Sequence, residues 1–287
     1  MSYTATIGFF DGVHKGHLYL LQRLREEAQM RGMRSAVITF EQHPQQVLTG
    51  VAPKLLNTFD ERVERLKATG VTQIFAFRFD LVRNMSALEF LKVLHEQCEV
   101  NTLLMGYDHQ FGADGRKSPD TYRKMGQEAG VEILFVEQAP EGDVSSSKIR
   151  KTLISGDVPE AANMLGENYT LQGQVVHGQG WGHRLGFPTA NIQIADSHKL
   201  IPKNGVYAAQ VQTEDGTSHQ AVLNIGTNPT IGGNERTVEV HILDFDGDLY
   251  AQSLRVELLR YLREEQHFAS LDLLKRQIAK DVAEARQ

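Results

Sequence analysis

The pattern of apolar segments changes about halfway along the chain, and this change limits the folds available to it. From Tyr3 to about Gly130, short apolar runs alternate with helix-like segments, as is typical of βαβ units around a parallel sheet. The expected strands cover residues 3–9, 35–40, 73–77, 103–106 and 132–136. Because ligands collect beyond the carboxyl ends of such strands, functional groups are expected in the loops that follow them.

Helix-terminus signals separate these strands. They are two glycines at expected C-caps (Gly32, Gly70), two capping boxes (Thr58 with Glu61, Ser86 with Glu89) and a proline suited to a first helical turn (Pro119).

After about Met164 the chain becomes a series of strand-like segments separated by turn-forming residues. The segments cover residues 171–177, 190–194, 206–212, 220–225, 238–243 and 253–259. This pattern predicts an antiparallel barrel or sandwich. A last helix follows, capped by Ser270, with one apolar face expected to pack on the barrel (Leu271, Leu274, Ile278, Val282). We place the boundary between residues 155 and 170, giving domains of 1–160 and 161–287.

Composition excludes several classes of protein. A chain of 287 residues can form two domains of ordinary size, and its net charge of −6 provides no basic field for binding nucleic acid. The single cysteine, Cys98, excludes an internal disulfide. No apolar run reaches the roughly 20 residues of a membrane helix, and the first strand begins too early for a signal peptide. These features predict a soluble, cytoplasmic protein.

The segment TIGFFDGVHKGHLYLLQRL, residues 4–22, places two histidines where an expected strand meets an expected helix. His14 and His17 would share one side of the helix start, where unpaired N–H groups and the helix dipole favour an anion, and Gly16 permits close approach. A triphosphate site fits this arrangement. A metal site is an alternative, although no third ligand follows at a usual spacing, and a capped helix with two exposed histidines is another.

A glycine-dense segment, HGQGWGHRLGFPTANI, lies in the second half. It matches neither a P-loop nor a dinucleotide fingerprint, and it fits a flap whose exposed N–H groups cover phosphates. Thr189 and Asn191 would face the same side of a strand, where their oxygens suit Mg²⁺. The alternative is a Gly-Pro loop with two polar surface residues.

Two further patterns have ordinary structural explanations. The serines before Lys148 and Arg150 resemble a loop that ends in an N-cap. In RTVEVHILDF, alternation makes Glu239 a solvent-facing strand residue, and His241 a second polar one.

Taken together, these motifs resemble one family. GFFDGVHKGH is similar to the HxGH signature of nucleotidyltransferases, and its extended form resembles the bacterial bifunctional riboflavin kinase/FMN adenylyltransferase family, also called FAD synthetase. TFEQHP, GYDHQFGADGR and VSSSKIRKTL resemble further loops of the first module. GHRLGFPTANI, NIGTNPTIGG and EVHILDFDGDLY resemble the riboflavin kinase module. The resemblance implies a Rossmann-like α/β domain followed by a β-barrel with a C-terminal helix.

The resemblance also implies roles for residues. Glu239 would be the kinase base, Thr189 and Asn191 would organise Mg-ATP, and Arg150 would bind ATP phosphates. His14 and His17 would stabilise charge during adenylyl transfer. The remaining expected nucleotide- and flavin-binding residues are Gly8, Phe10, Asp11, Gly16, Asp108, Ser146, Gly178, Gly180, Gly182 and Pro188.

The implied function is phosphorylation of riboflavin by ATP to FMN, followed by adenylylation of FMN to FAD with release of pyrophosphate. ATP, riboflavin, FMN and FAD would be the partners, and Mg²⁺ the cofactor. Two alternatives remain at this point: only one module is active, or the chain is a flavin- or nucleotide-binding regulator without turnover. The acidic balance disfavours an RNA-acting ligase.

Overall fold

The computed structural model of the chain describes residues 2–106, 109–140, 142, 144–178, 182, 185–230 and 233–287. The chain divides into two compact units, residues 1–146 and 147–287. In the described residues, no helix is long and apolar enough to cross a membrane.

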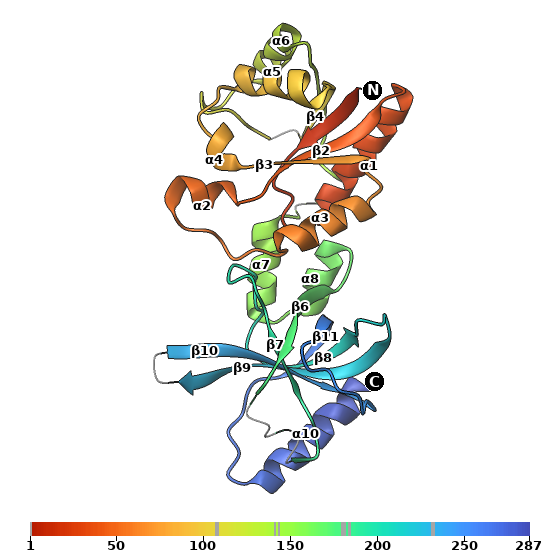
Figure 1. Ribbon diagram of the computed structural model, residues 1–287, viewed down its shortest axis with the longest axis vertical. Helices are drawn as coiled ribbons and strands as arrows, with labels where there is room; N and C mark the ends of the chain where they lie inside the picture. The colour runs from red at the N-terminus through yellow and green to blue at the C-terminus, as the bar shows by residue number, and fades with distance from the viewer. Residues whose placement is uncertain are drawn as a thin grey trace. The chain divides into compact units, whose positions relative to one another are not determined.

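The first unit is a five-stranded parallel sheet with helices (Figure 1). Its elements in chain order are β1 (Tyr3–Ile7), α1 (Lys15–Met30), β2 (Arg34–Phe40), α2 (Pro44–Thr49), α3 (Phe59–Ala68), β3 (Gln73–Phe77), α4 (Phe79–Val82), α5 (Ala87–Cys98), β4 (Val100–Gly106), α6 (Pro119–Ala129) and β5 (Glu132–Val136). The strand order is β3-β2-β1-β4-β5. This order reverses direction between β1 and β4, so the loop after β1 lies at the switch point where such sheets bind ligands.

Local signals explain the helices of this unit. Both predicted capping boxes form, Thr58 with Glu61 at α3 and Ser86 with Glu89 at α5. Pro119 occupies the first turn of α6, as expected. Every residue of β1 is buried, as a central parallel strand covered on both faces requires. The predicted α/β architecture is confirmed.

The second unit begins with two helices and continues as a closed barrel. Its elements are α7 (Ser146–Ser155, whose first residue belongs to the first unit), α8 (Val158–Leu165), β6 (Tyr169–Val176), β7 (Ala190–Gln193), β8 (Gly205–Gln212), β9 (Ser218–Thr230), β10 (Gly233–Ile242), β11 (Ser253–Arg263) and α10 (Leu271–Ala285). The barrel order is β10-β7-β6-β11-β8-β9, and every pairing is antiparallel. Closure removes the exposed strand edges that an open sheet would leave.

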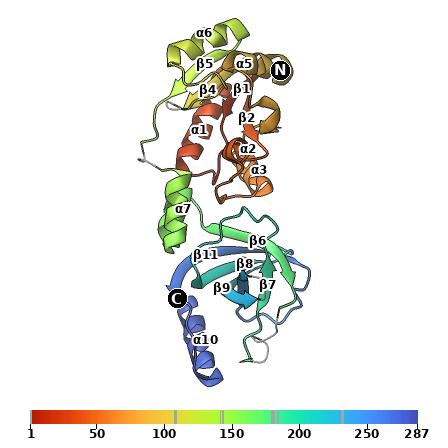
Figure 2. The ribbon, with the colours of Figure 1, turned by 90° about the vertical axis from the view of Figure 1, so that its left-hand side faces the viewer.

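The last helix packs on the barrel through a shifted face. α10 begins after the expected cap, Ser270, and contacts β8, β9 and β11 (Figure 2). Leu271 was expected on the packing face but is 57% exposed, so that part of the prediction is wrong. Ala285 and Asp281 are buried instead, and Asp281 forms an ion pair of 2.7 Å with Arg263 of β11. The apolar contact therefore involves the C-terminal part of the helix.

Candidate active sites

The chain makes a strained turn between β1 and α1. Phe10 and Val13 have φ angles of 58° and 38°, which residues with a Cβ rarely adopt. Such strain persists only where surrounding contacts hold it. The Asp11 carboxylate supplies contacts of this kind, because it accepts hydrogen bonds from the backbone N–H groups of Leu56 (2.9 Å) and Asn57 (3.2 Å). Asp11 thus fixes the turn by binding a distant segment, a role that its motif alone did not indicate.

This turn places the two histidines face to face. His14 is the N-cap residue of α1 and His17 lies in its first turn, and their rings stack with centroids 3.6 Å apart. A Cβ on Gly16 would lie 3.3 Å from the His14 ring, so the glycine leaves room for the stack. The Phe10 and His17 rings pack edge to face, with their centroids 5.1 Å apart. His14 is only 6% exposed, so the interpretation as two exposed histidines is wrong.

Burial keeps both imidazoles neutral. Desolvation lowers the pKa of His14 to about 4, with Arg65 acting in the same direction and Asp11 opposing it. Burial, then the adjacent His14 ring, lowers the pKa of His17 well below its usual value. Within the described residues, the Nδ1 atoms of both rings are buried and have no hydrogen-bond partner. A phosphate bound here would raise both pKa values and favour the charged rings.

A metal ion at the histidine pair would need a third ligand. Across the described ranges, no group of three or more His, Cys, Asp or Glu side chains is placed to hold a metal.

The other residues expected in this first site have varied positions. The Ser146 hydroxyl donates to the Asp11 carbonyl at 2.9 Å, which ties the start of α7 to the turn. Arg150 lies one turn further along α7. A Cβ on Gly8 would lie 3.1 Å from the Phe10 ring, so this glycine makes room for Phe10. Asp108 lies outside the described residues.

Beside the turn is an apolar cavity of about 430 Å³ that the sequence did not predict. Its lining includes the aromatic rings Phe9, Phe40, Phe79, Phe90 and Phe111, together with Gly8, Leu48, Val82 and Met85. Its volume falls within the range of small-molecule sites. The only signal in the sequence was the number of phenylalanines near strand ends, which a core explains equally well.

Arg62 is a second residue that sequence reasoning missed. It lies on the polar helix α3, yet its side chain is fully buried. Its guanidinium lies over the Phe9 ring at 3.8 Å and donates to the Phe40 carbonyl. Burial lowers its pKa to about 10, so the group remains charged at neutral pH. Arg62 therefore links the segment after β1 to the last residue of β2, and Phe9 and Phe40 both line the cavity.

In the barrel, three predicted residues meet on adjacent strands. Glu239 of β10 pairs in register with Asn191 of β7, and Thr189 directly precedes β7. The Thr189 hydroxyl forms a hydrogen bond with the Glu239 carboxylate. Burial raises the pKa of Glu239, and the hydrogen bond from Thr189 opposes this effect. Glu239 is half-buried rather than exposed, so the solvent-facing interpretation is wrong.

The glycines of the second motif lie directly against these side chains. A Cβ on Gly178 would lie 2.0 Å from Asn191 Nδ2. A Cβ on Gly182 would lie 2.5 Å from the Phe187 carbonyl oxygen and 2.8 Å from Thr189 Oγ1. A Cβ at either position would force neighbouring atoms to move. Gly180 and most of the expected flap lie outside the described residues.

A cavity of about 360 Å³ opens beside this cluster. Thr189, Asn191, Gly178 and Pro188 line it, as does Tyr250, whose ring stacks on His177 at 3.8 Å. His241 Nδ1 lies 2.8 Å from the Pro188 carbonyl oxygen, so His241 supports the backbone before Thr189. Sequence reasoning had considered His241 only as a polar contact.

The donor set of the barrel site fits Mg²⁺. Mg²⁺ takes oxygen ligands and usually keeps several waters and substrate phosphates, so it needs few groups from the protein. Thr189 and Asn191 line the cavity. Glu239 does not line it, but its carboxylate bonds to the Thr189 hydroxyl and the residue pairs in register with Asn191.

The chain thus belongs to a class of two-module proteins in which a Rossmann-like α/β unit precedes a closed antiparallel barrel, each with a cluster of polar groups beside a cavity. The FAD synthetase family model matches residues 2–152, and the riboflavin kinase family model matches residues 165–287. The bifunctional riboflavin kinase/FMN adenylyltransferase of Escherichia coli K12 is 38% identical, over 98% of this chain and 91% of its own length. The enzyme of that name from Listeria monocytogenes is 32% identical over 98% and 90%. The chain is a member of the bifunctional riboflavin kinase/FMN adenylyltransferase family.

A solved structure shares the whole architecture. A Streptococcus pneumoniae protein described as a macrolide-efflux protein covers 100% of this chain with 94% of its own length, at a TM-score of 0.91 and 29% identity. The arrangement of an α/β unit followed by a barrel is therefore not peculiar to this chain.

Proposed function

We propose that the barrel phosphorylates riboflavin with ATP to give FMN, and that the α/β unit transfers AMP from a second ATP to FMN, giving FAD and pyrophosphate. The observation that carries this proposal is the presence of two separate polar clusters on one chain. The stacked pair His14–His17 lies at the switch point of the sheet, and the cluster Thr189–Asn191–Glu239 lies on the barrel. ATP, riboflavin, FMN and FAD are then the small-molecule partners.

In the barrel, Glu239 acts as the general base. The ribityl 5′-oxygen attacks the γ-phosphorus of ATP, the bond to the ADP oxygen breaks, and the hydroxyl proton passes to Glu239. Its raised pKa brings the carboxylate closer to the neutral range in which a general base works best. Thr189 and Asn191 would hold the Mg²⁺ of Mg-ATP, which neutralises phosphate charge when bound.

In the α/β unit, no proton needs to be removed, because the FMN phosphate is already ionised. One of its oxygens attacks the α-phosphorus of ATP, and the bond to pyrophosphate breaks. His14 and His17 donate hydrogen bonds to phosphate oxygens, and they become better donors as negative charge accumulates. Ser146, the first residue of α7, supplies a further donor for the phosphates, and the resemblance of its motif to the family assigns Arg150 the same role. As in the barrel, Mg²⁺ accompanies the nucleotide.

The apolar cavity beside the turn takes the isoalloxazine ring of FMN. Flat aromatic ligands bind well between aromatic side chains, and Phe9, Phe90 and Phe111 all line this cavity. Gly8 also lines it and precedes the turn that carries the histidines, so a flavin here would have its phosphate end near them. We also propose a cytoplasmic location, where ATP is available.

The test is to incubate the full chain with riboflavin, ATP and Mg²⁺ and to separate the flavins by chromatography. Both FMN and FAD should appear. Glu239→Gln should slow FMN formation by about 10²–10⁴-fold while sparing conversion of added FMN to FAD. His17→Ala should slow FAD formation by about 10²–10³-fold and spare the kinase. If either variant lost both activities while folded, the division of labour proposed here would be wrong.

A further inference from the structure

The segment of residues 109–118, which leads toward α6, forms one wall of the apolar cavity. Residues 109–113 line the cavity directly. Within this wall, the Phe111 ring lies between Phe90 of α5, at 5.9 Å, and Tyr122 of α6, at 4.9 Å. The position of Phe111 therefore sets the shape of this side of the cavity.

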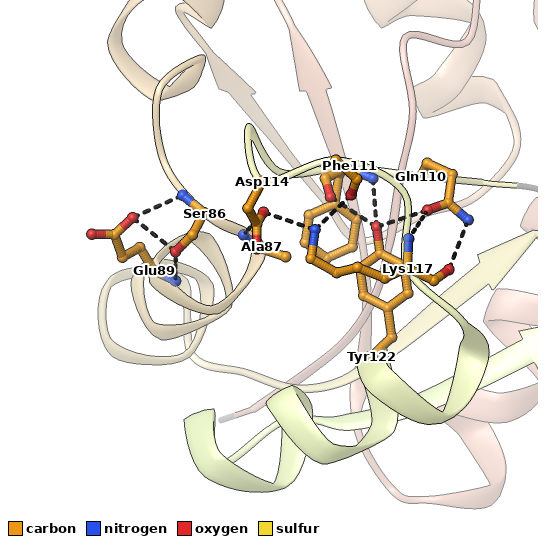
Figure 3. A network of polar contacts seen from close by, with 9 residues as sticks. Ser86, Ala87, Glu89, Gln110, Phe111, Asp114, Lys117 and Tyr122 are labelled. Atoms are coloured by element: carbon orange, nitrogen blue, oxygen red, sulfur yellow. Dashed lines mark hydrogen bonds and ion pairs between the residues drawn. The ribbon is translucent and has the colours of Figure 1, made fainter.

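The Tyr122 hydroxyl holds the backbone of Phe111 at both of its polar groups. The hydroxyl accepts from the Phe111 N–H at 2.8 Å and donates to the Phe111 carbonyl at 2.8 Å (Figure 3). The Tyr122 side chain is fully buried and does not line the cavity. It comes from a regular helix, α6, so it offers a fixed point to an otherwise irregular segment.

Further contacts close the segment into a compact loop. The two ends are joined by Gln110, whose side-chain amide accepts from the Lys117 N–H at 3.0 Å and donates to the Lys117 carbonyl at 3.3 Å. Lys117 forms an ion pair of 2.8 Å with Asp114, which also accepts from the N–H of Ala87 at 2.9 Å (Figure 3). The loop is therefore fastened to the start of α5 as well as to α6.

We propose that Tyr122 is a positioning residue for the flavin ring: by fixing Phe111 it sets the affinity of the α/β unit for FMN without touching FMN itself. This inference rests on the proposed assignment of the cavity to FMN. Loss of the hydroxyl would leave the N–H and carbonyl of Phe111 without their partner, and the loop would then populate other conformations. Only molecules with Phe111 in its present position would bind FMN well, so the apparent dissociation constant for FMN would rise as the fraction of such molecules falls.

The test uses the full chain and measures FAD formation at varied FMN and saturating Mg-ATP. Tyr122→Phe keeps the ring and removes only the hydroxyl. We expect its KM for FMN to rise about tenfold, which corresponds to ~1.4 kcal/mol. The kcat and the KM for Mg-ATP should stay within about twofold, because the residues that act on phosphate are untouched. A general loss of folding would instead lower the amount of active enzyme and hence the apparent kcat.

Two variants and one internal control complete the test. Tyr3→Phe removes a hydroxyl from the same hydrophobic core, where the described contacts include no bond from Tyr3 to the loop, and should leave the KM for FMN unchanged. Asp114→Ala, at an exposed position, should raise that KM by about threefold because it loosens the second anchor. The riboflavin kinase activity of every variant should equal that of the wild-type protein.

The possible outcomes distinguish an error in the role of Tyr122 from an error in the assignment of the cavity to FMN. If Tyr122→Phe and Asp114→Ala both keep the wild-type KM for FMN, Tyr122 does not position the flavin, although FMN can still occupy the cavity. If Phe111→Ala also keeps the wild-type KM for FMN, the cavity is not the FMN site, and the proposed assignment of the cavity to FMN is wrong. A fall in kcat at constant KM for Tyr122→Phe would likewise overturn the proposal.

Discussion

At the level of single residues, burial disfavours the charged forms of two groups whose sequence patterns are ordinary, a histidine at a helix start and a glutamate on a strand. His14 and Glu239 lie in environments that disfavour their charged forms, so both imidazole and carboxylic acid are shifted toward neutrality. In each case the shift accompanies an expected role in phosphate chemistry. The same shifts have consequences for stability that can be measured without any substrate.

The stability of the first unit should fall in acid because of His14. Its pKa is about 4 in the folded state, against a usual 6.5, so the folded chain binds fewer protons than the unfolded chain between these values. The folded state therefore has its full free energy of unfolding above pH 6.5, where His14 is neutral in both states. This free energy decreases as the pH falls from 6.5 toward 4. Lowering the pH from 7 to 5 should reduce the free energy of unfolding by about 2 kcal/mol through this residue alone.

Calorimetry of wild-type and His14→Gln proteins at pH 7, 6 and 5 checks this prediction. The variant should show the shallower loss of stability, because glutamine does not titrate. His267→Gln, which changes an exposed histidine of the second unit, should keep the wild-type slope. Equal slopes in the wild type and the His14 variant would show that burial of this ring is not coupled to protonation.

The site residues could be predicted from sequence only as far as their motifs identified them. Alternation along β10 predicted an exposed Glu239, because a period of two shows which residues share a face but not what covers that face. One contact on that face comes from Thr189, whose hydroxyl bonds to the Glu239 carboxylate, and the sequence spacing of 50 residues gives no sign of this contact. Arg62 was missed for the same reason: a charged residue on a polar helix gives no sign that Phe9 lies beneath it.

At the level of elements, local signals predicted the fold well. β3 and β5 have the expected bounds, and both capping boxes form, because these signals depend on neighbours within a few residues. β9 and β10 extend beyond the predicted segments, to Thr230 and from Gly233. The residues added to these strands are mostly polar and include Gly226, Pro229 and Gly233, so pairing between the strands, and not local preference, makes them regular.

Close packing of the second glycine motif gives an element-level prediction. Gly178→Ala would place a methyl group on the Asn191 amide, so the start of β7 must move or Asn191 must leave the cavity. We expect riboflavin phosphorylation to fall at least tenfold, since an Ångström-scale displacement of a positioning group commonly costs about 10²-fold. FMN adenylylation by the same preparation should be unchanged.

Gly216→Ala serves as the control for this variant. Gly216 lies in a turn of the same barrel with φ of 84°, and a Cβ there meets no atom within 4 Å. That change should cost about 1 kcal/mol of stability through backbone strain and leave kinase activity intact. Full kinase activity in Gly178→Ala would mean that Asn191 need not occupy its present position.

At the level of the whole molecule, the chain divides into units that each bury their own apolar residues. Two clusters of buried side chains consist entirely of residues from the first unit, and a third consists entirely of residues from the second. The predicted division near residue 160 remains a proposal, since compactness places the boundary after Ser146 whereas the family models match residues 2–152 and 165–287. Separate cores predict separate unfolding transitions.

A matched pair of core substitutions tests this independence. Leu94 of α5 and Leu258 of β11 are both fully buried, so replacing either by alanine should cost about 2–5 kcal/mol. Leu94→Ala should lower only the calorimetric transition of the first unit, and Leu258→Ala only that of the second. The two activities should be lost in the corresponding order on heating. Leu94→Ala should lose FAD formation at a lower temperature than FMN formation, and Leu258→Ala should lose FMN formation first. A single transition that moves with either substitution would mean that the two units unfold cooperatively. A core substitution in one unit would then also lower the stability of the site in the other.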